Sequence, residues 1–132
     1  MIVVDTHVLV WWVHGDMTKF AAPVSRRFDE ELRNGSVCVS AILAWEIAML
    51  VRKGRLELAV DVSRWLATVA EISGLSFMPV DNAVAVKSVE LPGDFHDDPA
   101  DRIIVALARE LSAPLVTADE RIRRYPYVET IW

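Results

Sequence analysis

Short apolar runs alternate with longer segments of helical periodicity along the chain. The runs are rich in Val, Ile and Leu and are too short for helices, which is typical of buried parallel strands. They lie at residues 2–5, 36–39, 75–80, 115–117 and 127–132. Pro79 restricts the third run to a sheet edge or a strand end, because proline has no amide hydrogen to donate. We therefore expect a sheet of four to five strands.

The segments between these runs predict helices that begin at capping residues and end at glycine or proline. One helix is expected over 23–34, where Val24, Phe28 and Leu32 recur every four residues. Others are expected over residues 8–13, 41–53, 62–69, 82–91, 99–108 and 120–124. Strands that alternate with helices predict an α/β fold with a parallel sheet covered on both faces.

Acidic residues stand where these strands end. Asp5 closes the first run, Asp119 follows the fourth, and Glu46 lies about two turns into the helix after the second. Ligands of parallel α/β sheets bind beyond the carboxyl ends of the strands. Taken singly, Asp5 and Asp119 also suit helix N-caps, and Glu46 also suits a solvated helix face. Taken together, they predict a shared acidic site.

The sequence His-Asp-Asp-Pro-Ala-Asp-Arg at 96–102 opens the helix before the fourth strand. Pro99 suits its first turn and Asp98 its N-cap. Asp101 is then still in the first turn, near the positive end of the helix dipole. We expect Asp98 to act mainly as a cap and Asp101 to be the ligand of the acidic site.

Several carboxylates held close together cannot all stay ionised without a cation. The chain has no His or Cys at metal-ligand spacing, and we expect His7, His14 and His96 to be structural or solvated. Carboxylate ligands favour Mg²⁺ or Mn²⁺, and such sites activate water and neutralise phosphate charge. Phosphodiester hydrolysis is the chemistry that these residues favour, with phosphomonoester hydrolysis as an alternative.

Composition limits the other possibilities. The 132 residues, 53% hydrophobic and 25% charged, are typical of one globular domain over 1–132. No apolar run approaches ~20 residues, so no membrane span is expected. The single Cys38 forms no internal disulfide and suits a core thiol in the cytoplasm. A net charge of −5 argues against a nucleic-acid partner, but four metal-bound acids would leave 15 acidic against 14 basic residues.

Basic residues follow two of the acids. Arg52, Lys53 and Arg55 come after Glu46, and Arg121 comes after Asp119. Both groups suit contacts to an RNA phosphate backbone, although solvated helix ends carry the same residues. Trp11 and Trp12 are adjacent on an apolar segment, which favours an apolar groove for a partner helix.

Four motifs resemble the PIN-domain ribonucleases, and specifically the VapC-like toxins of type II toxin–antitoxin pairs. They run in the family's order from one end of the chain to the other. They are Asp5-Thr6-His7, Trp45-Glu46-Ile47 with the trailing Lys53-Gly54-Arg55-Leu56, His96-x-Asp98-Pro99-x-Asp101-Arg102, and Leu115-Val116-Thr117-x-Asp119.

The resemblance implies a three-layer α/β/α sandwich with strand order 3-2-1-4-5. It implies that Asp5, Glu46, Asp101 and Asp119 hold Mg²⁺ or Mn²⁺, supported by Asp98 and Thr117. It further implies endoribonuclease activity, a homodimer and a cognate antitoxin. Two other classes stay open: a metal-dependent phosphatase, and a catalytically inactive PIN-like module that binds RNA or protein.

Overall fold

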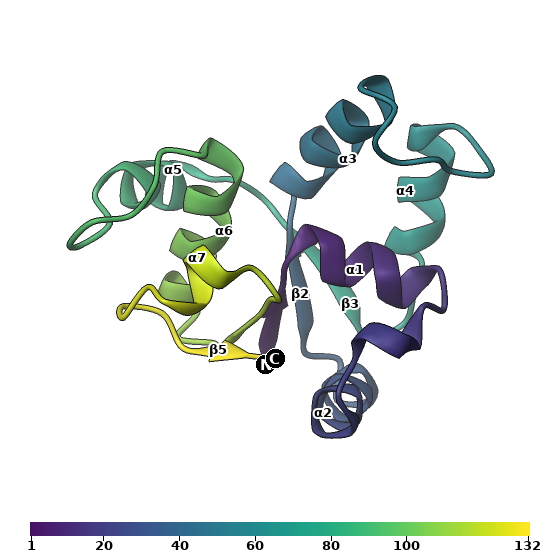
Figure 1. Ribbon diagram of the computed structural model, residues 1–132, viewed down its shortest axis with the longest axis horizontal. Helices are drawn as coiled ribbons and strands as arrows, with labels where there is room; N and C mark the ends of the chain where they lie inside the picture. The colour runs from purple at the N-terminus through teal and green to yellow at the C-terminus, as the bar shows by residue number, and fades with distance from the viewer.

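The computed structural model describes residues 1–132 and has five parallel strands in one sheet (Figure 1). The strands are β1 (Ile2–Val4), β2 (Val37–Ser40), β3 (Leu75–Met78), β4 (Leu115–Val116) and β5 (Thr130–Ile131). Their order in the sheet is β3-β2-β1-β4-β5, as the resemblance implies. The third strand is an edge strand that ends before Pro79, which confirms the restriction expected from the proline.

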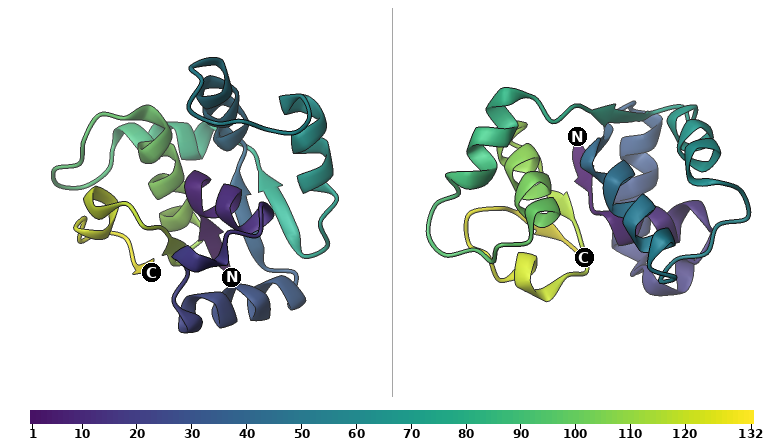
Figure 2. Two further views of the ribbon diagram at one scale, coloured as in Figure 1. Left: turned by 45° about the vertical axis from the view of Figure 1, so that its right-hand side comes forward. Right: turned by 90° about the horizontal axis from the view of Figure 1, so that it is seen from above.

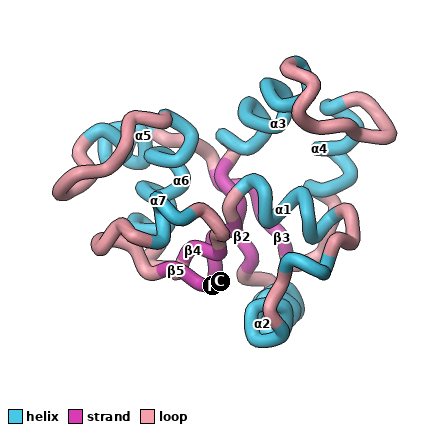
Figure 3. Tube along the Cα trace, in the orientation of Figure 1, coloured by secondary structure: helices cyan, strands magenta, loops and turns pink.

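Seven α-helices and one 3₁₀ turn connect the strands. They are α1 (Thr6–Val13), the turn η1 (Met17–Lys19), α2 (Ala22–Arg33), α3 (Ile42–Arg52), α4 (Val62–Ala70), α5 (Asn82–Val89), α6 (Pro99–Glu110) and α7 (Glu120–Arg123). Helices α5 and α6 lie on one side of the central strands and α1, α3 and α4 on the other (Figures 1 and 2). The sheet is therefore the middle of three layers, and the strands gather at the centre of the chain trace (Figure 3).

The core is built from the apolar runs of the sequence. All three residues of β1 have no exposed surface, and Ile47, Ile104 and Leu115 are equally buried. Cys38 lies in this core and is free, as expected. None of the helices is both long and apolar enough to span a membrane.

The first helix begins earlier than the sequence predicts. It starts at Thr6 rather than Val8, because the side chain of Asp5 accepts a hydrogen bond from the Thr6 amide and acts as the N-cap. The Thr6 side chain is thus free for another contact, which lies in the site described next.

Candidate active site

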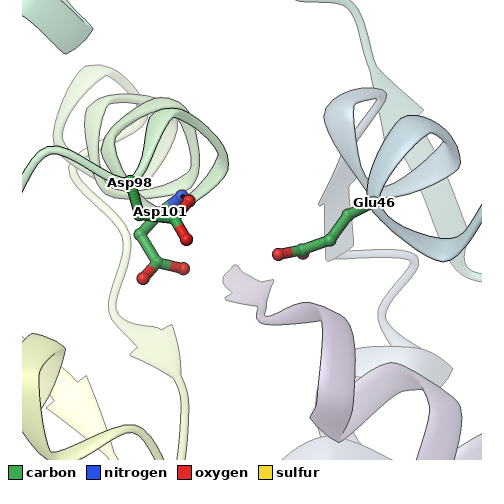
Figure 4. A group of neighbouring side chains, drawn as sticks. All are labelled: Glu46, Asp98 and Asp101. Atoms are coloured by element: carbon green, nitrogen blue, oxygen red, sulfur yellow. Dashed lines mark hydrogen bonds between the residues drawn. The ribbon is translucent and has the colours of Figure 1, made fainter. Parts of the chain in front are cut away.

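Five acids gather where the strands of the sheet end. Asp5 follows β1, Asp98 and Asp101 lie at the start of α6, and Asp119 caps α7 just after β4. Glu46 reaches toward them from α3 (Figure 4). Asp5 and Asp101 are only 6% and 7% exposed, although carboxylates are seldom buried without compensation.

Three of these carboxylates form the tightest group. One oxygen each of Glu46, Asp98 and Asp101 lies within 4.8 Å of the other two, and Figure 4 shows Glu46 facing the two aspartates across a gap. Asp98 is therefore more than the helix cap that we expected. Its Oδ1 does accept the amides of Ala100 and Asp101, at 3.0 and 3.2 Å. The same carboxyl group also takes part in the acidic cluster.

Hydroxyl groups orient two of the acids, Asp5 and Glu46. The Thr117 hydroxyl donates to Asp5 Oδ2 at 2.6 Å and accepts the Asp119 amide at 3.1 Å. Thr117 therefore links two of the acids, in the supporting position that the sequence predicts. The Thr6 hydroxyl donates to the Glu46 carboxylate. This contact could not be predicted, because no local sequence pattern relates residues 40 positions apart.

His96 is also part of the site, contrary to the expectation that it is structural or solvated. Its Nε2 lies 2.7 Å from Asp101 Oδ2, which makes it a positioning group for that carboxylate. The other two histidines fit the expectation better: His14 accepts a hydrogen bond from Trp65, and His7 is exposed beside Trp11. His96 opens the acidic motif at 96–102, and this proximity could have identified it as part of the site.

Arg102 holds the loop that carries His96 and Asp98. Its guanidinium group donates to four backbone carbonyls, those of Ser88, Val89, Phe95 and His96, at 2.8 to 3.2 Å. The first two carbonyls belong to the end of α5 and the last two to the loop before α6. One side chain thus fixes the path of this loop relative to both helices.

Burial dominates the electrostatics of the acids. It raises the pKa of Asp5, Glu46 and Asp101 above the ordinary values, and neighbouring carboxylates raise each pKa further. Hydrogen bonds from Thr117, Thr6 and His96 partly offset these increases. Arg121 is the one cation in contact with the acids, with its Nη2 3.5 Å from Asp101 and 3.7 Å from Asp119. Its side chain is 59% exposed, so this compensation is weak.

The other basic residues of the sequence analysis lie beside the site. Lys53 and Arg55 line a cleft together with Glu46 and Asp98. Arg52 is exposed at the end of α3 and does not line this cleft. A contact of these residues to RNA stays a prediction.

The fold and the acidic edge together define a family. A family model described as the PIN domain matches residues 2–127, and the chain belongs to that family. Among curated proteins, Ribonuclease VapC22 of Mycobacterium tuberculosis is 36% identical over 135 aligned residues. The alignment covers 99% of this chain and 98% of the relative.

Solved structures show the same fold at lower identity. The DNA-bound VapBC of Salmonella typhimurium matches with a TM-score of 0.69 and 20% identity, over 98% of this chain and 96% of that one. FitAcB of Neisseria gonorrhoeae matches with a TM-score of 0.68 and 22% identity, over 100% of this chain and 97% of that one. These likenesses confirm the predicted three-layer architecture.

Proposed function

We propose that this protein is a Mg²⁺- or Mn²⁺-dependent endoribonuclease and the toxin of a toxin–antitoxin pair. The observation that carries the proposal is the cluster of acids at the strand ends of a PIN fold, of which Asp5 and Asp101 are buried. The relative that is 36% identical is a ribonuclease, which supports the same activity. A catalytically inactive PIN-like module is disfavoured, because all the acids that the family motifs carry are in place.

The donor set fits a hard divalent cation. The nearest donors are carboxylate oxygens, with no thiolate among them, which favours Mg²⁺ or Mn²⁺ over zinc. The raised pKa values of Asp5, Glu46 and Asp101 also indicate that a bound cation would stabilise the ionised carboxylates. We propose Asp5, Glu46, Asp101 and Asp119 as the ligands, with Asp98 beside them. A bound ion of this kind supplies an activated water and neutralises charge on a phosphate.

The remaining residues of the site position these acids. Thr6 and Thr117 hold the carboxylates of Glu46 and Asp5, and His96 holds Asp101. We propose that Arg52, Lys53, Arg55 and Arg121 contact the phosphate backbone of RNA. Lys53 and Arg55 line a cleft with Glu46 and Asp98, Arg121 contacts Asp101 and Asp119, and Arg52 ends α3.

Cleavage of RNA by the purified, partner-free protein tests the activity. We expect single-stranded or looped RNA to be cut with Mg²⁺ or Mn²⁺, and cutting to stop with EDTA. Asp101→Asn should reduce the rate at least about a hundredfold, because it removes a carboxylate from the centre of the cluster. Circular dichroism should show an intact fold in that variant. Wild-type cleavage by Asp101→Asn would refute the site, and hydrolysis of phosphomonoesters but not RNA would favour the phosphatase alternative.

We propose an antitoxin as the protein partner, because several structural neighbours are VapBC or toxin–antitoxin complexes. The groove expected at Trp11 and Trp12 stays a prediction, and Trp11 lines a small cleft with Asp5 and Asp119. Trp11 packs on Trp132 and Trp12 on Phe28, with ring centroids 5.8 and 4.7 Å apart.

A better place for an apolar partner helix lies between α3, α4 and the edge strand β3. This cleft of about 400 Å³ is lined by Ala41, Ala44, Ser63, Leu66, Ala67, Ala70 and Phe77. Small side chains let the backbone of a partner helix come close. Ala67→Trp fills the cleft from an exposed position and should weaken inhibition by the antitoxin without changing RNA cleavage. Unchanged inhibition would show that the antitoxin binds at another surface.

We also propose that the protein forms a homodimer, acts in the cytoplasm and consists of a single domain over 1–132. Val86 and Val89 on α5 are 54% and 76% exposed and lie on one helix face, which suits an interface between two copies. Light scattering of wild type and of Val86→Asp/Val89→Asp tests the dimer. We expect the double variant to be monomeric at concentrations where wild type is dimeric.

A further inference from the structure

A second cleft adjoins the acidic cluster on its α3 side. It has a volume of about 210 Å³ and lies between the outer face of α3, the segment after it, and the first turn of α6. Its lining residues are Trp45, Glu46, Met49, Leu50, Lys53, Arg55, Asp98 and Pro99. Two of them, Glu46 and Asp98, belong to the tight group of carboxylates. The cleft therefore begins at the candidate active site itself.

Trp45 presents an unused aromatic face to this cleft. It is 53% exposed, whereas Trp65 is buried and Trp11, Trp12 and Trp132 are half-buried. Each of those four rings packs on another aromatic or imidazole ring, and Trp45 packs on none. An indole that is left exposed beside a reactive site is a ready surface for stacking.

Two cations stand at the same cleft without an acidic partner. Lys53 and Arg55 are exposed, and neither takes part in an ion pair of this chain. By contrast, Arg27, Lys87 and Arg123 are all paired with glutamates. The cleft thus combines an aromatic face, free positive charge and a boundary of carboxylates.

We propose that this cleft is a subsite for one unpaired nucleotide of an RNA substrate, with the base stacked on Trp45 and a phosphate beside Lys53 and Arg55. The inference rests on the proposed nuclease function and deepens it. Single-stranded RNA offers both an unstacked base and backbone phosphates, and proteins bind it by aromatic stacking within a basic groove. A base in a continuous duplex has no free face, so the substrate class is RNA that is single-stranded next to the cleaved bond. A protein helix fits less well, because the lining carries four charged residues.

Steady-state cleavage of a single-stranded oligonucleotide with one mapped cleavage site tests the subsite. We expect Trp45→Ala to raise KM about 5- to 150-fold, the range that one stacked base contributes, and Trp45→Phe to retain most of the affinity. An abasic nucleotide is then placed at each position flanking the cleaved bond. At one position it should weaken wild type by a similar factor and weaken Trp45→Ala no further.

Binding of the labelled RNA in EDTA, measured by fluorescence anisotropy, gives a readout without turnover. Replacing Lys53 and Arg55 together by Gln should flatten the dependence of log K on log salt by about 0.7 for each lost phosphate contact. Matched controls are Tyr127→Ala, which removes a ring of 49% exposure from the segment between α7 and β5, and Arg26→Gln, which removes an exposed cation from α2. Both should leave KM and the salt dependence unchanged.

The possible failures are distinct. Absence of metal-dependent RNA cleavage by wild type would overturn the proposed function. Normal cleavage by wild type with an unchanged KM in Trp45→Ala would overturn only the subsite. An unchanged KM accompanied by loss of the homodimer or of antitoxin binding in Trp45→Ala would assign the tryptophan to a protein interface instead.

Discussion

Buried acids lie at both ends of strand β1, and their surroundings differ. At the start of the strand, Glu31 of α2 is 8% exposed and meets the ammonium group of Met1 at 2.7 Å, the Ser36 hydroxyl, and Arg27 at 2.9 Å. These contacts, with the ammonium group first, lower its pKa to about 2. At the end of the strand, burial raises the pKa of Asp5 and of Asp101.

The difference separates Glu31 from the acids that we propose as metal ligands. Glu31, Asp5 and Asp101 are buried to a similar degree, so burial does not distinguish them. Glu31 has two cations of its own, whereas among the five acids at the carboxyl edge only Asp101 and Asp119 contact one, the exposed Arg121. The carboxyl edge is therefore short of positive charge, and a bound cation would correct that imbalance.

The largest effect that we expect is stabilisation of the folded protein by metal. It should depend on the acids at the carboxyl end of β1 and not on Glu31 at the start of the strand. Mg²⁺ or Mn²⁺ at a hundredfold excess over its Kd should raise the free energy of unfolding of wild type by about 2.7 kcal/mol. Asp101→Asn should gain much less, and Glu31→Gln should gain as much as wild type. Thermal melts with EDTA and with metal measure this. Equal stabilisation of wild type and Asp101→Asn would show that Asp101 is not a ligand of the metal.

Removing the imidazole beside Asp101 sharpens the comparison, because His96 supports an acid much as Ser36 supports Glu31. We expect His96→Ala to weaken Mn²⁺ binding about 10- to 100-fold, the usual effect of losing a group that orients a metal ligand. His96→Gln retains a donor and should recover part of the affinity. Calorimetric titration with Mn²⁺ checks both, and identical affinities in the two variants would show that the hydrogen bond is not the cause.

Glu31→Gln should be destabilising at neutral pH by about 1–2 kcal/mol, because it removes a charge held by cations that are themselves about half exposed. The folded-state pKa of Glu31 is lowered from 4.5 to about 2. Its contribution is therefore present above pH 4.5 and is lost as the pH falls toward 2. Urea unfolding of wild type and variant from pH 7 to pH 2 should show the difference shrinking across that window.

Asp101→Asn should stabilise the metal-free protein, whereas Glu31→Gln destabilises it. We expect its free energy of unfolding to rise by about 1 kcal/mol at neutral pH. The raised pKa of Asp101 means that the folded state keeps its proton to higher pH than the unfolded state. Stability is therefore lost as the pH rises from the ordinary value of 3.8 through the raised folded value, and the loss persists above it. Melting in EDTA across this range should fall less steeply for the variant. Asp119→Asn is a weaker test, since Asp119 also caps α7.

Much of the fold and the position of the acids could be predicted from the sequence. Buried strands appear as apolar runs because both of their faces are covered, and β1, β2 and β4 lie within one residue of the expected bounds. An acid at or just beyond the end of such a run lies at the carboxyl edge, which is why Asp5 and Asp119 were identifiable. The strand order came from the resemblance to the family and not from the pattern itself.

Contacts between distant segments could not be predicted in the same way. The hydrogen bond from Thr6 to Glu46 and the four contacts of Arg102 depend on packing that no local pattern encodes. The exposure of Trp45 follows from helix geometry instead. Trp45 and Ile47 flank Glu46, and residues two apart on a helix point about 200° apart. Ile47 is fully buried, and Trp45 therefore faces outward.

The four carbonyls held by Arg102 also bear on how the chain can change in length during evolution. A residue inserted between Val89 and Phe95 would shift a carbonyl away from the guanidinium group and displace the start of α6. The connection between α3 and α4 has no such anchor and is mostly exposed beyond Arg55, so insertions there leave the acids in place. Length variation among descendants of this sequence should therefore accumulate between α3 and α4 and be rare between α5 and α6.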